Sequence, residues 1–149
     1  MKRSTPHETW TAAEYQAYLK TKQKPSKANK YNAVRAEYNG RSYDSQGEAD
    51  YARHLDLMKA AGEVKRVTQQ YKLRLEANGI HICDYFIDFR LVMADGSIVL
   101  AEFKGMETDL WKQKWAMLKA QLSELEPNAT LWLVKKMNGG FEIVEKFTC

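Results

Sequence analysis

An apolar stripe in the last third of the chain limits the folds open to it more than any other feature. Its members recur at i, i+4, i+7, i+11 and i+14, the spacing of one face of an α-helix. They are Trp111, Trp115, Leu118, Leu122 and Leu125. The stripe predicts a helix over about residues 108–125, a core element rather than a base-stacking surface, and Pro127-Asn128 ends it. Strand-like runs at 98–104 and 130–134 flank this helix.

The remaining patterns complete the order of elements. Asn39-Gly40 predicts a tight hairpin, and a second helix begins at Ser45 and stops at Gly62. Further strand-like runs cover residues 64–68, 71–75, 81–93 and 141–147. The order is helix, several strands, helix, two strands. It predicts a mixed sheet with helices packed on it, an α/β (α+β) domain.

The basic residues are concentrated ahead of this domain. Residues 20–35 carry six positive charges and no acid: Lys20, Lys22, Lys24, Lys27, Lys30 and Arg35. Removing these six from the 23 basic residues leaves 17 against 19 acidic ones, so the net charge falls from +4 to −2. We therefore expect a short N-terminal helix and basic arm over residues 1–32 and one domain over 33–149. Such an arm suits a polyanion such as nucleic acid, but it also suits a solubilising linker.

Composition excludes several classes of protein. Apolar residues make up 44% of the 149 residues, which is enough for a core and too much for a disordered chain. Cys83 and Cys149 have no nearby thiol partner, and the three histidines lack ligand spacing, so neither a disulfide scaffold nor a zinc site is expected. No apolar run approaches the ~20 residues of a membrane helix, and no apolar leader precedes the domain. We expect a soluble intracellular protein.

Two acids interrupt strands that otherwise read as buried. Ala94-Asp95-Gly96 suits a three-residue hairpin loop with Gly96 left-handed, which pairs residue 93 with residue 97. That register places Asp88 opposite Glu102 and residue 86 opposite Lys104, so both acids and the lysine share a face. A two-residue Asp-Gly turn would instead put the acids on opposite faces.

Two carboxylates at close quarters repel, and a hard divalent cation relieves the repulsion. Mg²⁺ binds through one or two carboxylates, waters and a phosphate oxygen, and it lowers the pKa of a bound water. A nearby lysine orients that water or stabilises developing negative charge. This set of groups suits hydrolysis of a phosphodiester. The alternative is a cross-strand salt bridge in which Lys104 compensates Asp88 and Glu102.

The chain also resembles a known family. It is similar to the PD-(D/E)XK nuclease superfamily of restriction-endonuclease-like fold. Within it, it resembles small, mostly phage-borne proteins related in pattern to Holliday-junction resolvases. The resemblance covers about residues 30–147. It rests on Asn29-Lys30-Tyr31, Asn39-Gly40, Asp44-Ser45-Gln46-Gly47-Glu48-Ala49, Gln70-Tyr71-Lys72-Leu73, Ile87-Asp88-Phe89 and Glu102-Phe103-Lys104-Gly105.

The resemblance implies a role for each matching residue. Glu48, Asp88 and Glu102 would bind Mg²⁺, with Mn²⁺ as a substitute and the Phe103 carbonyl as a further ligand. Lys104 would assist the attacking water. Ile87 stands where the superfamily's name has proline.

Two of these assignments have competing interpretations. Ser45-x-x-Glu48 is also a capping box, in which Glu48 would bind the helix N-terminus. Asp84 lies four residues before Asp88 on a strand of period two, so it is the alternative acid.

The expected function is a metal-dependent DNA endonuclease in the cytoplasm, that of the host cell if the protein is phage-encoded. Branched DNA such as a Holliday junction, in phage recombination or replication, is the expected substrate, and a homodimer would suit a symmetric junction. The alternatives are a non-catalytic nucleic-acid-binding module that keeps the fold, and an adaptor whose arm contacts another protein. The residues expected to contact DNA are Lys22, Lys24, Lys27, Lys30, Arg35, Gln70 and Lys114.

Overall fold

The structure is a computed structural model, and it describes residues 11–13 and 35–149. By its contacts the chain divides into Met1–Val34 and Arg35–Cys149. Four of the residues expected to hold DNA lie outside the described residues: Lys22, Lys24, Lys27 and Lys30. No helix within the described ranges has the length and apolarity needed to cross a membrane. Everything below concerns the second unit.

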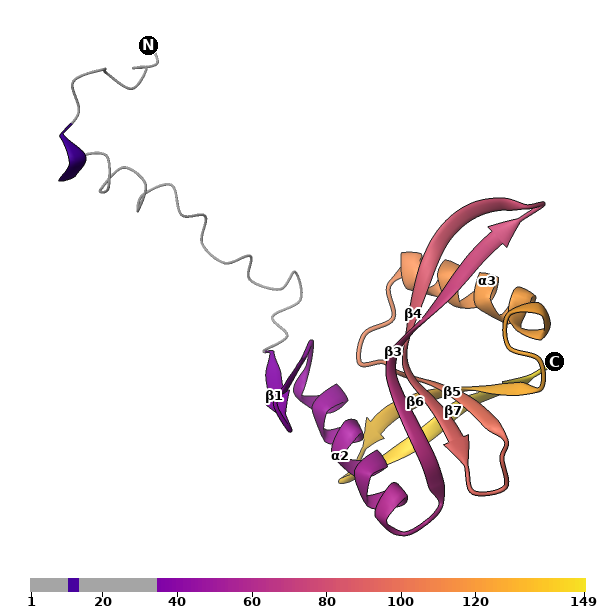
Figure 1. Cartoon of the computed structure of the whole chain (residues 1–149), viewed down its shortest axis with the longest axis horizontal. Helices are drawn as coiled ribbons and strands as arrows, with labels where there is room; N and C mark the ends of the chain where they lie inside the picture. The colour runs from indigo at the N-terminus through magenta and orange to yellow at the C-terminus, as the bar shows by residue number, and fades with distance from the viewer. Residues whose placement is uncertain (1–10, 14–34) are drawn as a thin grey trace. The chain divides into compact units, whose positions relative to one another are not determined.

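This unit is built on a five-stranded mixed sheet with a helix against each face (Figure 1). The strand order is β3-β4-β5-β6-β7, with β5 and β6 parallel and every other pair antiparallel. The predicted α+β class is therefore confirmed. The elements, in chain order, are β1 (Ala36–Tyr38), β2 (Arg41–Tyr43), α2 (Gln46–Ala60), β3 (Val64–Ala77), β4 (Ile80–Met93), β5 (Ile98–Phe103), α3 (Asp109–Leu125), β6 (Ala129–Met137) and β7 (Gly140–Thr148).

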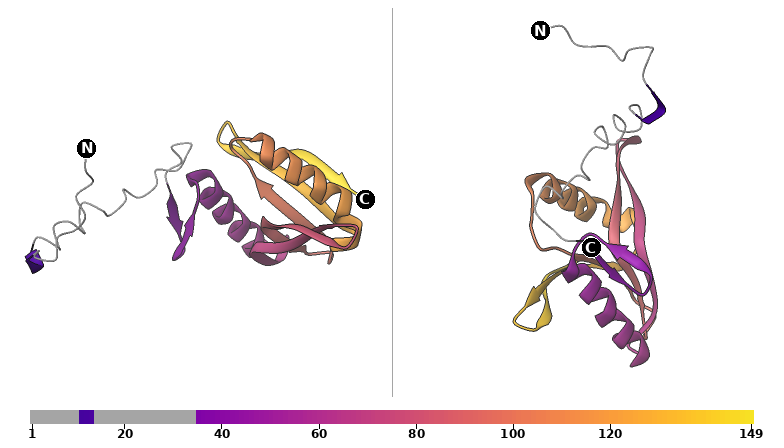
Figure 2. Two further views of the ribbon diagram at one scale, coloured as in Figure 1. Left: turned by 90° about the horizontal axis from the view of Figure 1, so that it is seen from above. Right: turned by 90° about the vertical axis from the view of Figure 1, so that its left-hand side faces the viewer.

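Each helix closes a separate core. The α2-side core joins the buried stripe of α2 to β4, β5 and β6, and it includes Tyr51, Leu55, Phe89, Leu91, Val99 and Ala101. The α3-side core joins the stripe of α3 to the outer half of the β3–β4 hairpin and to β5 and β6. It includes Leu73, Tyr85, Ile87, Leu100, Trp115, Leu118 and Leu131. Figure 2 shows the two helices beside different parts of the sheet.

The β3–β4 hairpin serves both cores because it turns over in the middle. Side chains two apart normally share a face of the sheet. On β4, however, Ile87 belongs to the α3-side core, whereas Phe89 belongs to the α2-side core. On β3, Val67 packs on the α2 side, whereas Tyr71 packs on the α3 side. The change of face therefore occurs between these positions on both strands.

Gln70 is the residue at which β3 turns over. The ladder pairs Gln69 with Phe89 and Tyr71 with Ile87, so Gln70 lies across from Asp88. Gln70 has φ of 51°, a left-handed conformation that is uncommon for a non-glycine residue. The sequence predicted two strands, 64–68 and 71–75. The structure has one continuous strand, β3, whose side chains exchange faces of the sheet at Gln70.

The predicted β4–β5 register is confirmed. The Met93 amide donates to the Ser97 carbonyl at 2.9 Å, and Gly96 has φ of 86°, as the three-residue loop requires. The ladder runs from Val92↔Ile98 to Phe89↔Ala101 and then stops. One further step of the same register places Asp88 opposite Glu102, at the point where β5 separates from β4.

Helix α2 approaches this point because its first turn contains a glycine. A β-carbon at Gly47 would lie 2.6 Å from Cζ of Phe103, the last residue of β5. The Phe103 ring is itself held between Tyr51 and Phe141, at centroid distances of 6.1 and 6.2 Å. Only a residue without a side chain lets the first turn of α2, and with it Glu48, lie this close to the end of β5.

Gly47→Ala should therefore lower the free energy of unfolding by about 1–3 kcal/mol, the usual cost of overpacking. Gly105→Ala is the matched control, because an added β-carbon there would meet no atom within 4 Å. Urea unfolding followed by tryptophan fluorescence measures both. Equal stability of the two variants would contradict the close approach of α2 to β5.

Candidate active site

Asp88 and Glu102 are linked through the backbone of each other's strand. The Asp88 amide donates to Glu102 Oε2 at 3.4 Å, and the Phe103 amide donates to Asp88 Oδ2 at 2.9 Å. Glu102 is only 6% exposed, which makes it the one fully buried charged residue among those described. The sequence prediction that these two acids meet is confirmed in its geometry.

Tyr85 and Trp111 hold the far side of Glu102. The indole Nε1 of Trp111 donates to Glu102 Oε1 at 3.2 Å and to the Tyr85 hydroxyl at 3.0 Å. Trp111 is buried, as its place in the apolar stripe predicted. Its second role, as a hydrogen-bond donor to the acid, was missed. The available signal was that a buried indole N–H usually needs a polar partner.

Lys104 follows Glu102 at the end of β5. Its amide donates to the Val134 carbonyl at 3.0 Å, and its ammonium lies 5.4 Å from the centre of the Trp111 ring. Burial raises the pKa of Glu48, Asp88 and Glu102, and the positive charge of Lys104 opposes part of that rise in each. Lys104 therefore lies within electrostatic reach of all three predicted acids.

Glu48 lies near the pair, in the first turn of a helix that Ser45 caps. The Glu48 amide donates to Ser45 Oγ at 3.2 Å, and the Glu48 carboxylate accepts the backbone N–H of Asp44. Burial raises the pKa of Glu48 to about 7, with a further contribution from the negative charge of Asp88. Half of the predicted capping box is therefore present: Ser45 caps the helix, whereas the Glu48 carboxylate interacts with the Asp44 N–H, one residue before the cap.

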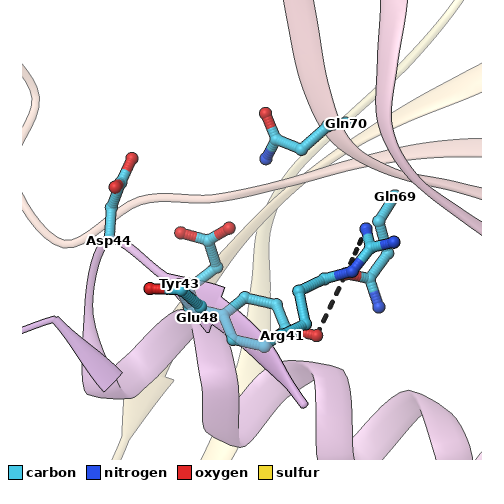
Figure 3. Close-up of a pocket in the computed structure, with 7 residues that line it drawn as sticks. Arg41, Tyr43, Asp44, Glu48, Gln69 and Gln70 are labelled. Atoms are coloured by element: carbon cyan, nitrogen blue, oxygen red, sulfur yellow. Dashed lines mark hydrogen bonds between the residues drawn. The ribbon is translucent and has the colours of Figure 1, made fainter. Parts of the chain in front are cut away.

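Gln70 completes the environment of Asp88. Its side-chain amide donates to Asp88 Oδ1 at 3.3 Å. It also lines a cavity of about 180 Å³ with Arg41, Ser42, Tyr43, Asp44, Glu48 and Gln69. In Figure 3 the Glu48 carboxylate and the Gln70 amide both point into this cavity. Gln70 was predicted to contact DNA at the edge of the site, and the structure places it against the acid itself.

The same view shows what fixes one wall of the cavity. Arg41 and Tyr43, both on β2, donate to the Gln69 side-chain oxygen at 3.1 and 3.0 Å (Figure 3). The β1–β2 hairpin is thereby anchored to the part of β3 that precedes Gln70.

The alternative acid, Asp84, is engaged elsewhere. Its carboxylate forms an ion pair of 3.0 Å with Lys72 and a hydrogen bond of 3.0 Å with the His81 ring, and the Lys72 hydrogen bond is the main reason that its pKa is lowered. The structure therefore favours Asp88 over Asp84. Among the residues predicted to contact DNA, Arg35 lies 3.7 Å from Asp44, and Lys114 lines a second cavity beyond Glu102.

The family comparison covers the whole of this site. A family described as "Protein of unknown function (DUF1064)" matches residues 28–138. The chain belongs to the DUF1064 family. Comparisons with curated proteins and with solved structures gave no match. The matched region of this DUF1064 chain contains Glu48, Asp88, Glu102 and Lys104 and ends just before β7.

The expected convergence of three carboxylates on one ion is not preformed in the DUF1064 chain. Residues 11–13 and 35–149 contain no group of three or more His, Cys, Asp or Glu side chains placed to enclose a metal. The reason is that Glu102 is turned toward Trp111 and the Asp88 amide, while Asp88 is turned toward the Phe103 amide.

The chemistry of the donors nevertheless fits a hard cation. The three side chains offer only carboxylate oxygens, the ligands that Mg²⁺ prefers. Burial raises the pKa of Asp88, as does the charge of Glu102, and burial also raises the pKa of Glu102. Lys104 offsets this only in part, so the cluster carries more negative charge than its own surroundings stabilise.

In metal-free buffer the free energy of unfolding should therefore fall as the pH rises from 5 to 8. The folded chain keeps protons on these raised-pKa carboxyls that the unfolded chain has already lost, since their ordinary pKa values are 3.8 and 4.5. Unfolding then releases protons across this range, and stability declines with pH. Urea unfolding at several pH values measures the slope, which Asp88→Asn should make shallower.

Asp84→Asn is the matched control for this measurement. The pKa of Asp84 is lowered rather than raised, so its pairing contributes stability that is lost only as the pH falls. The Asp84→Asn variant should therefore show the same decline in the free energy of unfolding between pH 5 and 8. Stability that stays level or increases over this range in the unsubstituted chain would contradict the raised pKa values.

Proposed function

We propose that this DUF1064 protein is a metal-dependent endonuclease that hydrolyses phosphodiester bonds in DNA. The observation that carries the proposal is the Asp88–Glu102 pair at the end of β5, with Lys104 two residues beyond it and Glu48 brought in by α2. The resemblance to PD-(D/E)XK nucleases implies the same four residues. Branched DNA, a homodimer and a phage or host-cytoplasmic context remain expectations from that resemblance.

Asp88, Glu102 and Glu48 would hold Mg²⁺, or Mn²⁺ in its place. When bound, the ion polarises a phosphate oxygen and lowers the pKa of a coordinated water. The backbone amides of Asp88 and Phe103 hold the two strand carboxylates in their metal-free orientation, so binding of the ion would have to turn at least one of these side chains. Gln70 donates to Asp88 and keeps one of its oxygens oriented toward the cavity side.

Lys104 supplies the positive group of the chain itself. Its ammonium, held over the Trp111 ring, orients the attacking water or stabilises negative charge that develops on the phosphate. Trp111 contacts both Lys104 and Glu102, so it couples the position of the ammonium to that of the carboxylate. Arg35 and Lys114, together with the basic arm, would contact the DNA backbone.

A cleavage assay tests the proposal. The full chain is incubated with linear, nicked, flapped and four-way DNA in Mg²⁺ or Mn²⁺. Asp88→Asn and Lys104→Met should each lower the rate by about 100-fold or more, the usual effect of removing one charge-stabilising group. Asp84→Asn, which removes an acid four residues away that has its own partners, should cut at nearly the normal rate.

A second measurement does not depend on cleavage. Millimolar Mg²⁺ should raise the melting temperature of the unsubstituted chain, because a ligand that binds only the folded state stabilises it, and Asp88→Asn should abolish this shift. DNA binding without cleavage under any metal would instead favour the non-catalytic module. Cleavage that survives Asp88→Asn would overturn the assignment of the site.

A further inference from the structure

A second cavity, of about 200 Å³, adjoins Glu102 and shares no lining residue with the first. Its lining residues come from β4, β5 and α3: Asp84, Tyr85, Phe86, Glu102, Trp111 and Lys114. Glu102 belongs both to this cavity and to the proposed active site. A strand of DNA whose phosphate lies at the acid pair would therefore have an adjoining nucleotide at this cavity.

The cavity lies where the sheet leaves room for it. β4 is paired with β5 only from Phe89 to Val92, so the part of β4 before Asp88 is paired with β3 alone. Phe86 lies on this stretch. Its neighbours Tyr85 and Ile87 are buried, yet Phe86 is 52% exposed and belongs to neither core.

Phe86 is also without an aromatic partner. Ring contacts join Tyr85 to Trp115 and Trp111 to Trp115, but none within the described part of the chain involves Phe86. An exposed aromatic ring at the rim of a cavity is the kind of surface on which a nucleic-acid base stacks. Phe86 is paired across the ladder with Lys72, and its exposed surface is open to a ligand.

The charges around the cavity suit the backbone on either side of a base. Lys114 forms no ion pair with any residue in the described ranges, so its ammonium is free to meet a phosphate. The one acid at the outer rim, Asp84, is already compensated by Lys72 and His81. The uncompensated acid at this cavity is therefore Glu102, and its repulsion of a DNA phosphate would be relieved by the proposed metal.

We propose that this cavity receives one unpaired base of the DNA strand being cut, stacked on Phe86, with the neighbouring phosphate at Lys114. The inference rests on the proposed nuclease function and names its substrate class. The substrate would carry at least one unpaired nucleotide at the cleavage site, as single strands, flaps and open junctions do. A base inside an intact duplex would first have to leave its stack, which costs a few kcal/mol.

The test measures binding separately from cleavage. The full chain is titrated in Ca²⁺ with a single-stranded oligonucleotide that contains 2-aminopurine, and with the matching blunt duplex. The fluorescent base should be quenched by stacking in the single strand only. Phe86→Ala should remove the quench and weaken single-strand affinity by about 5- to 100-fold, with duplex affinity changed less than twofold.

Two further variants show whether stacking is responsible. Phe86→Tyr keeps a stacking ring and should keep both the quench and the affinity. Ile82→Ala removes a side chain of similar exposure, 49%, from the same strand but outside the cavity, and it should change neither. Melting curves confirm that all three variants fold.

The outcomes separate the two proposals. If Phe86→Ala binds single strands as the unsubstituted chain does, or loses single-strand and duplex affinity equally, the base pocket is overturned while metal-dependent cleavage can stand. If the quench depends on Phe86 but no DNA is cut in Mg²⁺ or Mn²⁺, the base pocket stands and the hydrolysis fails. Phe86→Ala that weakens cleavage of duplex and single strand alike would also count against the pocket.

Discussion

The left-handed backbone at Gln70 is the constraint on which the arrangement of this domain depends. It turns the β3–β4 hairpin over, so the inner half of the hairpin faces α2 and the outer half faces α3. A left-handed non-glycine residue costs roughly 1–2 kcal/mol. Burial of even one side chain such as Leu73 or Leu75 contributes about as much. Without this change of face, either α2 or α3 would lose the strand surface on which its apolar stripe packs.

The change of face in the β3–β4 hairpin also determines where the acids lie. Asp88 is opposite Gln70, at the position where β4 changes face and where β5 ends its pairing with β4. Backbone amides that the ladder leaves free at this position, those of Asp88 and Phe103, become donors to the two carboxylates. These hydrogen bonds do not cancel the cost of burying charge, because the pKa of both acids remains raised. The site is therefore a place where the fold gives up stability, which is typical of functional sites.

Local patterns were enough to predict some of this site, and long-range contacts explain the rest. The Asp88–Glu102 register follows from one hairpin loop and the period of a strand, so the sequence contained all that was needed. Gln70 was among the predicted DNA contacts, but its left-handed conformation could not be predicted, since glutamine has no preference for a left-handed backbone. The only trace was a gap in the apolar pattern at residues 69–70. The approach of Glu48 depends on Gly47 meeting Phe103, more than fifty residues away in the chain.

The split between β4 and β5 connects the chemistry to its substrate. Because pairing stops at Phe89, the acid pair lies at the last point where the two strands are joined, with one cavity toward Glu48 and Gln70 and another toward Phe86 and Lys114. A group bound at the acids would thus contact surfaces that belong to both cores. Under the proposed function, the metal site lies where the pairing of β4 with β5 ends, and the substrate is selected by the stretch of β4 that β5 leaves unpaired. In that proposal the acids would bind the metal that hydrolyses the phosphodiester, and the unpaired edge of β4 would admit only strands that have an unpaired base.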